Sequence, residues 1–209
     1  AALIWELLFL MLRTITLSSL SPSASAEDAK LWCRDATMIV HSVICILHAA
    51  IVGPAALHIL FNSPTISPVT DAILSFDTAR LSSPENLRAS DDGVPWLCAI
   101  SAGYFMFDLG NVALWGRVDA LMVAHHVISL IVWPIGVAVK MAVPFILIFM
   151  SSELSTPLLH ARSIVRIVYG PNCTLSNVGS LLFAFAFFGV RSWTPPFTLH
   201  AYAAMRLWD

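Results

Sequence analysis

The chain has 209 residues, of which 58% are hydrophobic and 11% charged, with a formal net charge of −2 and a mean hydropathy of +0.80. An ordinary soluble domain carries about a quarter charged residues, so the composition excludes a soluble globule with a polar surface. The absence of a basic stripe also excludes nucleic acid as a partner. The composition predicts an all-α, multi-pass transmembrane bundle of about six helices.

The first apolar run, Ala1–Leu20, is followed by SPSASA (Ser21–Ala26), which resembles the end of a secretory signal. No basic region precedes this run, however, and Glu6 and Arg13 interrupt it. We therefore expect residues 1–31 to form a first membrane helix and a polar connection. A membrane domain over residues 32–209, with a polar loop at 62–93, is expected to follow.

Further apolar runs approach the length of about 20 residues that crosses a bilayer as a helix. A short amphipathic helix is expected in the polar loop near Asp71–Leu81, and Ser155, Thr156 and Pro157 are expected to interrupt the fifth span. The last span contains Pro195-Pro196 and is expected to kink or split there. The five further spans are expected at Ala36–Phe61, Val94–Trp115, Leu121–Val139, Val143–Arg162 and Thr174–Leu207.

Five polar side chains in four of these spans are expected at a similar depth. Counted at about 1.5 Å per residue from the face at which the second span begins, they lie about 6–13 Å below it. They are His41, Asp108, His125, His126 and Glu153. His48 follows His41 by two helical turns and is therefore expected on the same helix face.

Two explanations of this layer stay open. Polar groups between membrane helices can serve as structural contacts worth about 0.6 kcal/mol per hydrogen bond, which is the favoured explanation for a single histidine. For the whole layer, the cost of about 2.5–3.5 kcal/mol for each buried ionisable group favours a lipid or substrate cavity. His125 and His126 point about 100° apart on a helix, so only one of them can face the centre of the layer.

A metal site is disfavoured by the spacing of the histidines. The HxxxH and HxxHH patterns that gather imidazoles around iron are absent, and two adjacent helical histidines converge poorly on one ion. The four cysteines, Cys33, Cys45, Cys98 and Cys173, show no paired spacing and are interpreted as small apolar residues. We therefore expect no metal and no cofactor.

Five segments, in this order, resemble the TLC-domain family of membrane proteins, which includes the ceramide synthases and a set of smaller proteins. The resemblance runs from about Trp32 to near the end of the chain and is closest to the smaller members. It implies a six-helix membrane fold around a cavity that admits a long acyl chain. The segments are RDATMIVHS (Arg34–Ser42), YFMFDL (Tyr104–Leu109), HH (His125-His126), SELSTPLLHAR (Ser152–Arg162) and FFGVR (Phe187–Arg191).

In the ceramide synthase branch, the paired histidines are the catalytic centre for acyl transfer from acyl-CoA to a sphingoid amine. The resemblance thus implies that His125 or His126 acts as a general base or transient acyl acceptor. That branch also has paired aspartates and a stretch rich in serine and aspartate after the histidines, whereas this chain has only Glu153 there. Candidate substrate-binding residues are His41, His48, Asp108, Glu153 and Arg162.

Two functions stay open. The chain either binds or modifies acyl lipids in an intramembrane cavity, with membrane lipids as partners, or serves as a non-catalytic accessory subunit of a respiratory or photosynthetic complex. The first places it in sphingolipid metabolism at the endoplasmic reticulum, and the second in the inner membrane of a mitochondrion or plastid. A proton-coupled transporter is disfavoured because no inverted repeat is visible.

Overall fold

The computed structural model describes residues 1–18, 25–81, 86, 88–115, 120–140 and 143–192. Within these residues the chain is helical and has no strand, which confirms the all-α fold class. The elements are α1 (Ala2–Ser18), α2 (Ala26–Asn62), α3 (Ser67–Leu74), α4 (Thr78–Leu81), α6 (Gly93–Trp115), α7 (Ala120–Ala138), α8 (Val143–Ser151), η1 (Ser152–Ser155), α9 (Thr156–Tyr169), α10 (Thr174–Phe187) and η2 (Phe188–Ser192).

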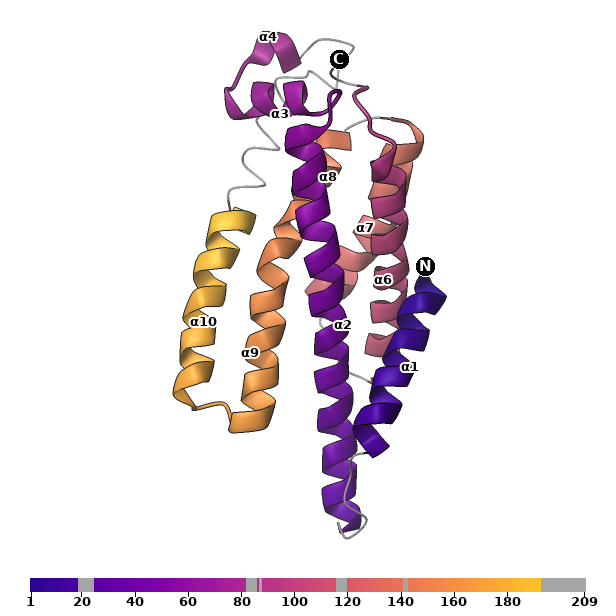
Figure 1. Cartoon of the computed structure of the whole chain (residues 1–209), viewed down its shortest axis with the longest axis vertical. Helices are drawn as coiled ribbons and strands as arrows, with labels where there is room; N and C mark the ends of the chain where they lie inside the picture. The colour runs from indigo at the N-terminus through magenta and orange to yellow at the C-terminus, as the bar shows by residue number, and fades with distance from the viewer. Residues whose placement is uncertain (19–24, 82–85, 87, 116–119, 141–142, 193–209) are drawn as a thin grey trace.

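Helix α2 is the axis of the bundle. It runs the length of the molecule, and α1, α6, α8 and α9 pack against it (Figure 1). The pair α9 and α10 lies on one side and the pair α1 and α6 on the other, while α3 and α4 lie across the end at which α2 finishes. The described segments long and apolar enough to cross a membrane are Glu27–Asn62, Ala120–Ala138, Val143–Tyr169 and Thr174–Arg191.

Helix α2 begins at Ala26, ten residues before the predicted start of the second span at Ala36. The side chain of Ser25 caps the helix by accepting a hydrogen bond of 3.1 Å from the backbone N–H of Asp28. Glu27 and Asp28 also place negative charge at the positive end of the helix dipole. These local signals extend the helix through charged residues that hydropathy alone had assigned to a connection.

The predicted interruption of the fifth span is a turn of 3-10 helix, η1, between α8 and α9. Pro157 has no N–H to donate to the carbonyl of Glu153, so that carbonyl accepts from the N–H of Thr156 instead. Ser152 and Ser155 donate their hydroxyls to carbonyls three residues earlier. The span then continues past its predicted end at Arg162 and closes at Gly170, whose φ of 87° suits glycine.

Gly53 on α2 allows η1 to approach closely. A Cβ atom at this position would stand 3.0 Å from the side chain of Leu154 and 3.2 Å from its backbone nitrogen. Since ordinary carbon contacts begin at about 3.5 Å, any larger residue would push η1 away. The glycine therefore sets the distance between α2 and the segment that carries Glu153.

The polar loop holds two short helices rather than the single one expected near Asp71–Leu81. Helix α3 starts with a proline in its first turn, and α4 follows after Phe76, whose φ of 56° turns the chain between them. This positive φ breaks the helical path, which the residue types alone did not indicate. The described part of the last span ends at Ser192, so Pro195-Pro196 lies outside the described residues.

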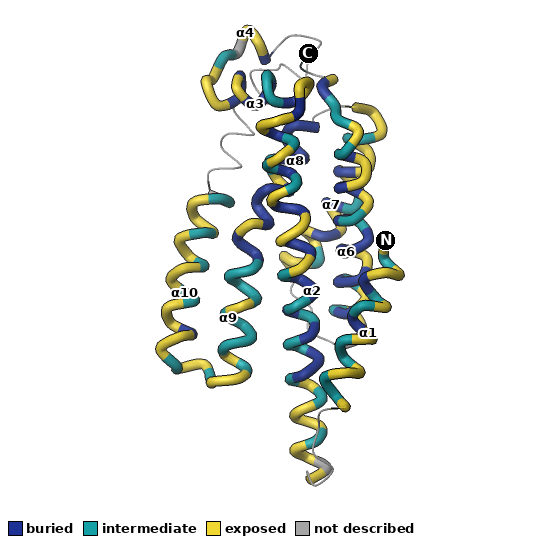
Figure 2. Tube along the Cα trace, in the orientation of Figure 1, coloured by how far each residue is buried: buried dark blue, intermediate teal, exposed yellow. Residues whose placement is uncertain are grey.

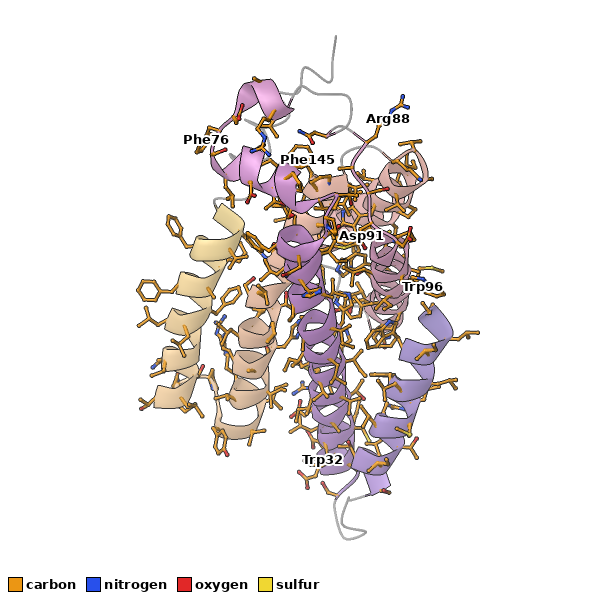
Figure 3. All side chains as sticks on the ribbon, turned by 45° about the horizontal axis from the view of Figure 1, so that its top comes forward. Trp32, Phe76, Arg88, Asp91, Trp96 and Phe145 are labelled. Atoms are coloured by element: carbon orange, nitrogen blue, oxygen red, sulfur yellow. The ribbon has the colours of Figure 1, made fainter. Side chains whose placement is uncertain are left out.

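Buried residues concentrate along the middle of α2 and along α8, whereas most of α10 is exposed or half-buried (Figure 2). Many exposed side chains are large and apolar, as expected for helices that contact lipid tails. Trp96 is 76% exposed, and Trp32 lies near the opposite end of the bundle from Phe76 and Arg88 (Figure 3). Such end positions are typical of interfacial tryptophans.

Candidate functional site

A cavity of about 390 Å³ lies between α2, α6, α7, η1, α9, α10 and η2. Its wall combines acidic, basic and imidazole side chains with aliphatic and aromatic ones. The residues that line it are His41, Cys45, Tyr104, Phe105, Asp108, Leu121, Met122, His125, His126, Glu153, Thr156, Leu159, His160, Phe187 and Arg191. The structure thus brings all five residues of the predicted polar layer to one cavity.

Asp108 lies at the centre of the polar wall and is 1% exposed. One carboxylate oxygen is 2.5 Å from His41 Nε2, and the other is 3.1 Å from His126 Nδ1. The second pair is within ion-pair distance, although the His126 N–H is not aligned for a hydrogen bond. Asp108, on α6, thus lies close to an imidazole of α2 and to one of α7.

Glu153 forms the second charged group of the wall, together with Arg191. The Arg191 guanidinium is 3.4 Å from Glu153 Oε1 and donates to the hydroxyls of Ser155 and Thr156, each at 3.1 Å. Thr156 in turn donates to Glu153 Oε2 at 2.7 Å. These bonds attach η2 to η1 and give a buried carboxylate a cation and a hydroxyl as partners, which its burial requires.

Arg191 was not predicted as a site residue, although it ends the FFGVR segment. It lies in a π-helical turn, Phe188–Ser192, and its guanidinium also stands over the ring of Phe187 at 5.7 Å. The final span was predicted to run from Thr174 to Leu207, and no depth in the membrane was derived for Arg191 within it. The available signal is a cationic residue within an otherwise apolar span, because a charge inside the bilayer needs a partner in the protein interior.

Cys45 and His160 are further members of the wall and are not among the predicted site residues. The Cys45 thiol is 3.8 Å from His41 Nδ1 and 3.9 Å from His41 Nε2, and His160 contacts the same thiol. The rings of His41 and His160 meet edge to face, with centroids 6.3 Å apart. The signal that could have revealed Cys45 is its spacing of four residues from His41, which puts both on one helix face.

The paired histidines differ in their surroundings, as their helical geometry predicts. His126 is 6% exposed, faces Asp108 and stacks on Phe105. His125 is exposed and makes ring contacts with Phe105 and His126, and it has no hydrogen bond to another residue in the described part of the chain. The histidine with an acidic partner is therefore His126, and His125 is the more accessible of the two.

His48 and Arg162 do not line the cavity. His48 is fully buried and stacks on Tyr104, with ring centroids 3.8 Å apart, and its Nε2 is 3.4 Å from Ser101 Oγ. Arg162 lies where α9 meets α10, beside Gly179. Both predicted binding residues are thus placed between helices, and we do not include them in the site.

A second cavity of about 240 Å³ adjoins the first and shares His41, Met122 and His160 with it. A third, of about 520 Å³, shares Thr37 and Met38 with the second and reaches the basic residues Lys30 and Arg34 near the start of α2. The cavities therefore follow one another along α2, from the polar wall to the end of the bundle.

Comparison with known protein families gives one match. A family model described as the TLC domain matches residues 39–209, which is more than four fifths of the chain and includes every residue of the first cavity. Comparisons with curated proteins and with solved structures give no match.

Proposed function

Because the chain belongs to the TLC-domain family of membrane proteins, we propose that it binds the acyl chain of a membrane lipid in the first cavity. The polar end of the lipid would lie against the cluster of Asp108, His126, Glu153 and Arg191. Catalysis is not required for this function.

The observation that carries the proposal is the amphiphilic wall of the cavity. Apolar surface for a hydrocarbon chain comes from Leu121, Met122, Leu159 and Phe187, while acids, imidazoles and a guanidinium supply the polar lining. The volume of about 390 Å³ falls in the range of about 300–1,000 Å³ that is usual for ligand pockets. An acyl lipid has the same division between a long apolar part and a compact polar part.

The position of Leu121 and Met122 supports entry from the bilayer. Both residues line the cavity, yet Leu121 is 82% and Met122 40% exposed. They belong to α7, a candidate membrane span whose other exposed residues are mostly apolar. A lipid tail could therefore pass from the surrounding hydrocarbon into the cavity without crossing water.

The polar wall is suited to binding a lipid through its oxygen atoms, which accept hydrogen bonds. Each acid already has a cationic or imidazole partner, so the wall carries no bare carboxylate that would repel a lipid phosphate or carbonyl. The guanidinium of Arg191 is fixed by Glu153 and two hydroxyls, and a guanidinium has five N–H donors. Its remaining donors, together with the accessible ring of His125, would hold the oxygens of the lipid.

Acyl transfer is a second candidate, favoured by the contact between His126 and Asp108. A carboxylate that orients an imidazole is the usual support of a general base. His126 would take the proton of an attacking hydroxyl, amine or water while the new bond to the acyl carbon forms. That proton would pass to the leaving group as its bond to the acyl carbon breaks.

Native mass spectrometry of the full chain, released from nanodiscs or mild detergent, tests the lipid proposal. We expect an acyl lipid to co-purify with the wild type. Leu159→Trp fills the cavity and should abolish the co-purification of the lipid. Leu182→Trp, the same change at an exposed position of α10, should leave the lipid bound. Equal lipid retention by the two variants would contradict the proposal.

A further inference from the structure

Three potential metal ligands converge on one wall of the cavity. His41 and Cys45 lie on the same face of α2, and Asp108 projects from α6. A nitrogen, a sulfur and an oxygen of these residues all lie within 4.8 Å of one another. We propose that His41, Cys45 and Asp108 bind one divalent transition-metal ion of the zinc class.

One of the donor separations is already close to that of a tetrahedral site, and a second needs a small adjustment. With bonds of about 2.0–2.1 Å to nitrogen and oxygen and about 2.3 Å to sulfur, neighbouring donors stand about 3.3–3.6 Å apart. Cys45 Sγ is 3.9 Å from His41 Nε2, within a few tenths of an ångström of this separation. His41 Nε2 and Asp108 Oδ1, at 2.5 Å, have to separate by about 0.8 Å as the ion replaces the proton between them.

The charges of the ligands favour a dication in this place. A thiolate and a carboxylate carry one negative charge each and His41 binds as the neutral ring, so a divalent ion makes the site neutral. Neutrality matters here because an uncompensated charge inside a membrane protein is costly. The sulfur donor selects zinc and its neighbours over magnesium and calcium, which prefer oxygen.

The surroundings fix the ligands and leave one position open. The second oxygen of Asp108 lies 3.1 Å from His126 Nδ1, and a neighbour of this kind can orient a metal-binding carboxylate. The three ligands belong to helices that pack directly against each other. His160 contacts Cys45 from α9, and all four residues line the cavity, so the fourth coordination position would face the cavity.

The spacing of the histidines among themselves and the lack of paired cysteines disfavour a metal, but neither pattern combines a histidine with a cysteine. The relevant pattern is HxxxC, His41 to Cys45, which puts two ligands one turn apart on α2. The third ligand, Asp108, comes from another helix and follows Cys45 by 63 residues in the chain. Only the packing of α2 on α6 reveals it.

Metal analysis of the purified full chain, carrying an affinity tag without histidine or cysteine, tests the inference. We expect about one zinc-class ion per chain, as a single site requires. Cys45→Ala and His41→Ala should lower this content at least fivefold, whereas Cys98→Ala, a buried cysteine outside the cluster, should retain it. Far-ultraviolet circular dichroism and size-exclusion profiles show whether each variant is folded.

Cobalt supplies a second measurement that does not depend on the folding of a variant. Co²⁺ bound by a thiolate gives a sulfur-to-metal charge-transfer absorption, which we expect on adding Co²⁺ to the metal-stripped wild type. Two results would overturn the inference: no stoichiometric metal and no thiolate band in the wild type, or a bound metal that Cys45→Ala and His41→Ala both retain. Lipid retention is measured separately, so failure here leaves the proposed function intact.

Discussion

His126 Nδ1 and Asp108 Oδ2 lie 3.1 Å apart, on the consecutive helices α7 and α6. The same carboxylate reaches His41 on α2 through its other oxygen. One acid thus joins three helices at the wall of the cavity. We expect it to stabilise the fold and to orient the imidazole that a lipid would meet.

Replacing Asp108 tests this role. Asp108→Asn keeps the shape but removes the charge that both imidazoles face, and losing one partner of a buried pair costs about 3–5 kcal/mol. We expect the substitution to lower the free energy of unfolding in detergent by about 3 kcal/mol. Tryptophan fluorescence monitors the unfolding. Asp92→Asn, at an exposed position, should change it by less than about 0.5 kcal/mol. Similar effects of the two substitutions would argue against a central carboxylate.

The two adjacent histidines should respond differently to truncation. His126→Ala leaves Asp108 without one of its partners and should lower the free energy of unfolding by about 1–3 kcal/mol. His125 is exposed, so His125→Ala should alter it by no more than about 0.5 kcal/mol. Thermal unfolding of both variants in the same detergent gives the comparison. A larger loss for His125→Ala would reverse the assignment of His126 as the buried partner.

The pair Glu153 and Arg191 should show energetic coupling. Arg191→Met leaves a buried carboxylate without its cation, and a hydrogen bond to a charged group contributes about 1.5–3 kcal/mol. Because Glu153→Gln removes the charge that Arg191 neutralises, the double variant should lose less stability than the sum of the single ones, by about 0.5–3 kcal/mol. A double-mutant cycle measures this difference. Arg166→Met, an exposed arginine on α9, should show no coupling to Glu153→Gln.

Gly53 and Gly110 offer a matched pair of glycine substitutions. A Cβ at Gly53 meets Leu154 at 3.0 Å, whereas a Cβ at Gly110 meets nothing within 4 Å. Gly110→Ala should therefore be neutral or stabilise α6 by up to about 1 kcal/mol, while Gly53→Ala should destabilise the protein by about 1–3 kcal/mol. Adding Leu154→Ala should recover part of that loss. Equal melting temperatures for the two alanine variants would contradict the close approach of η1.

Native gel electrophoresis after mild extraction separates lipid handling from the accessory-subunit alternative. We expect the chain to migrate as a small particle that retains its lipid. Co-migration with an assembly of high mass, together with loss of the chain from membranes that lack that assembly, would favour the accessory role.

The shared depth of Asp108 and Glu153 could be predicted from the sequence because helical rise fixes depth whatever the packing. Which of the other residues reach the cavity depends on how the helices pack. His48 follows His41 on one face, but the helical rise from residue 41 to residue 48 is about 10 Å, so His48 meets α1 and α6 beyond the cavity. Arg191 reaches Glu153 only through the π-helical turn after Phe187, and Cys45 in an apolar run has the pattern of a core residue.

Photo-crosslinking tests the lipid cavity most directly. Membranes containing the full chain would receive a lipid with a photoactivatable group in its acyl chain, and labelled residues would be mapped by mass spectrometry. We expect labels on Leu121, Met122 and Leu159, with competition by the unmodified lipid and loss in Leu159→Trp. Labelling spread equally over exposed α10 residues such as Leu182 and Phe185, without competition, would contradict a lipid site in the cavity.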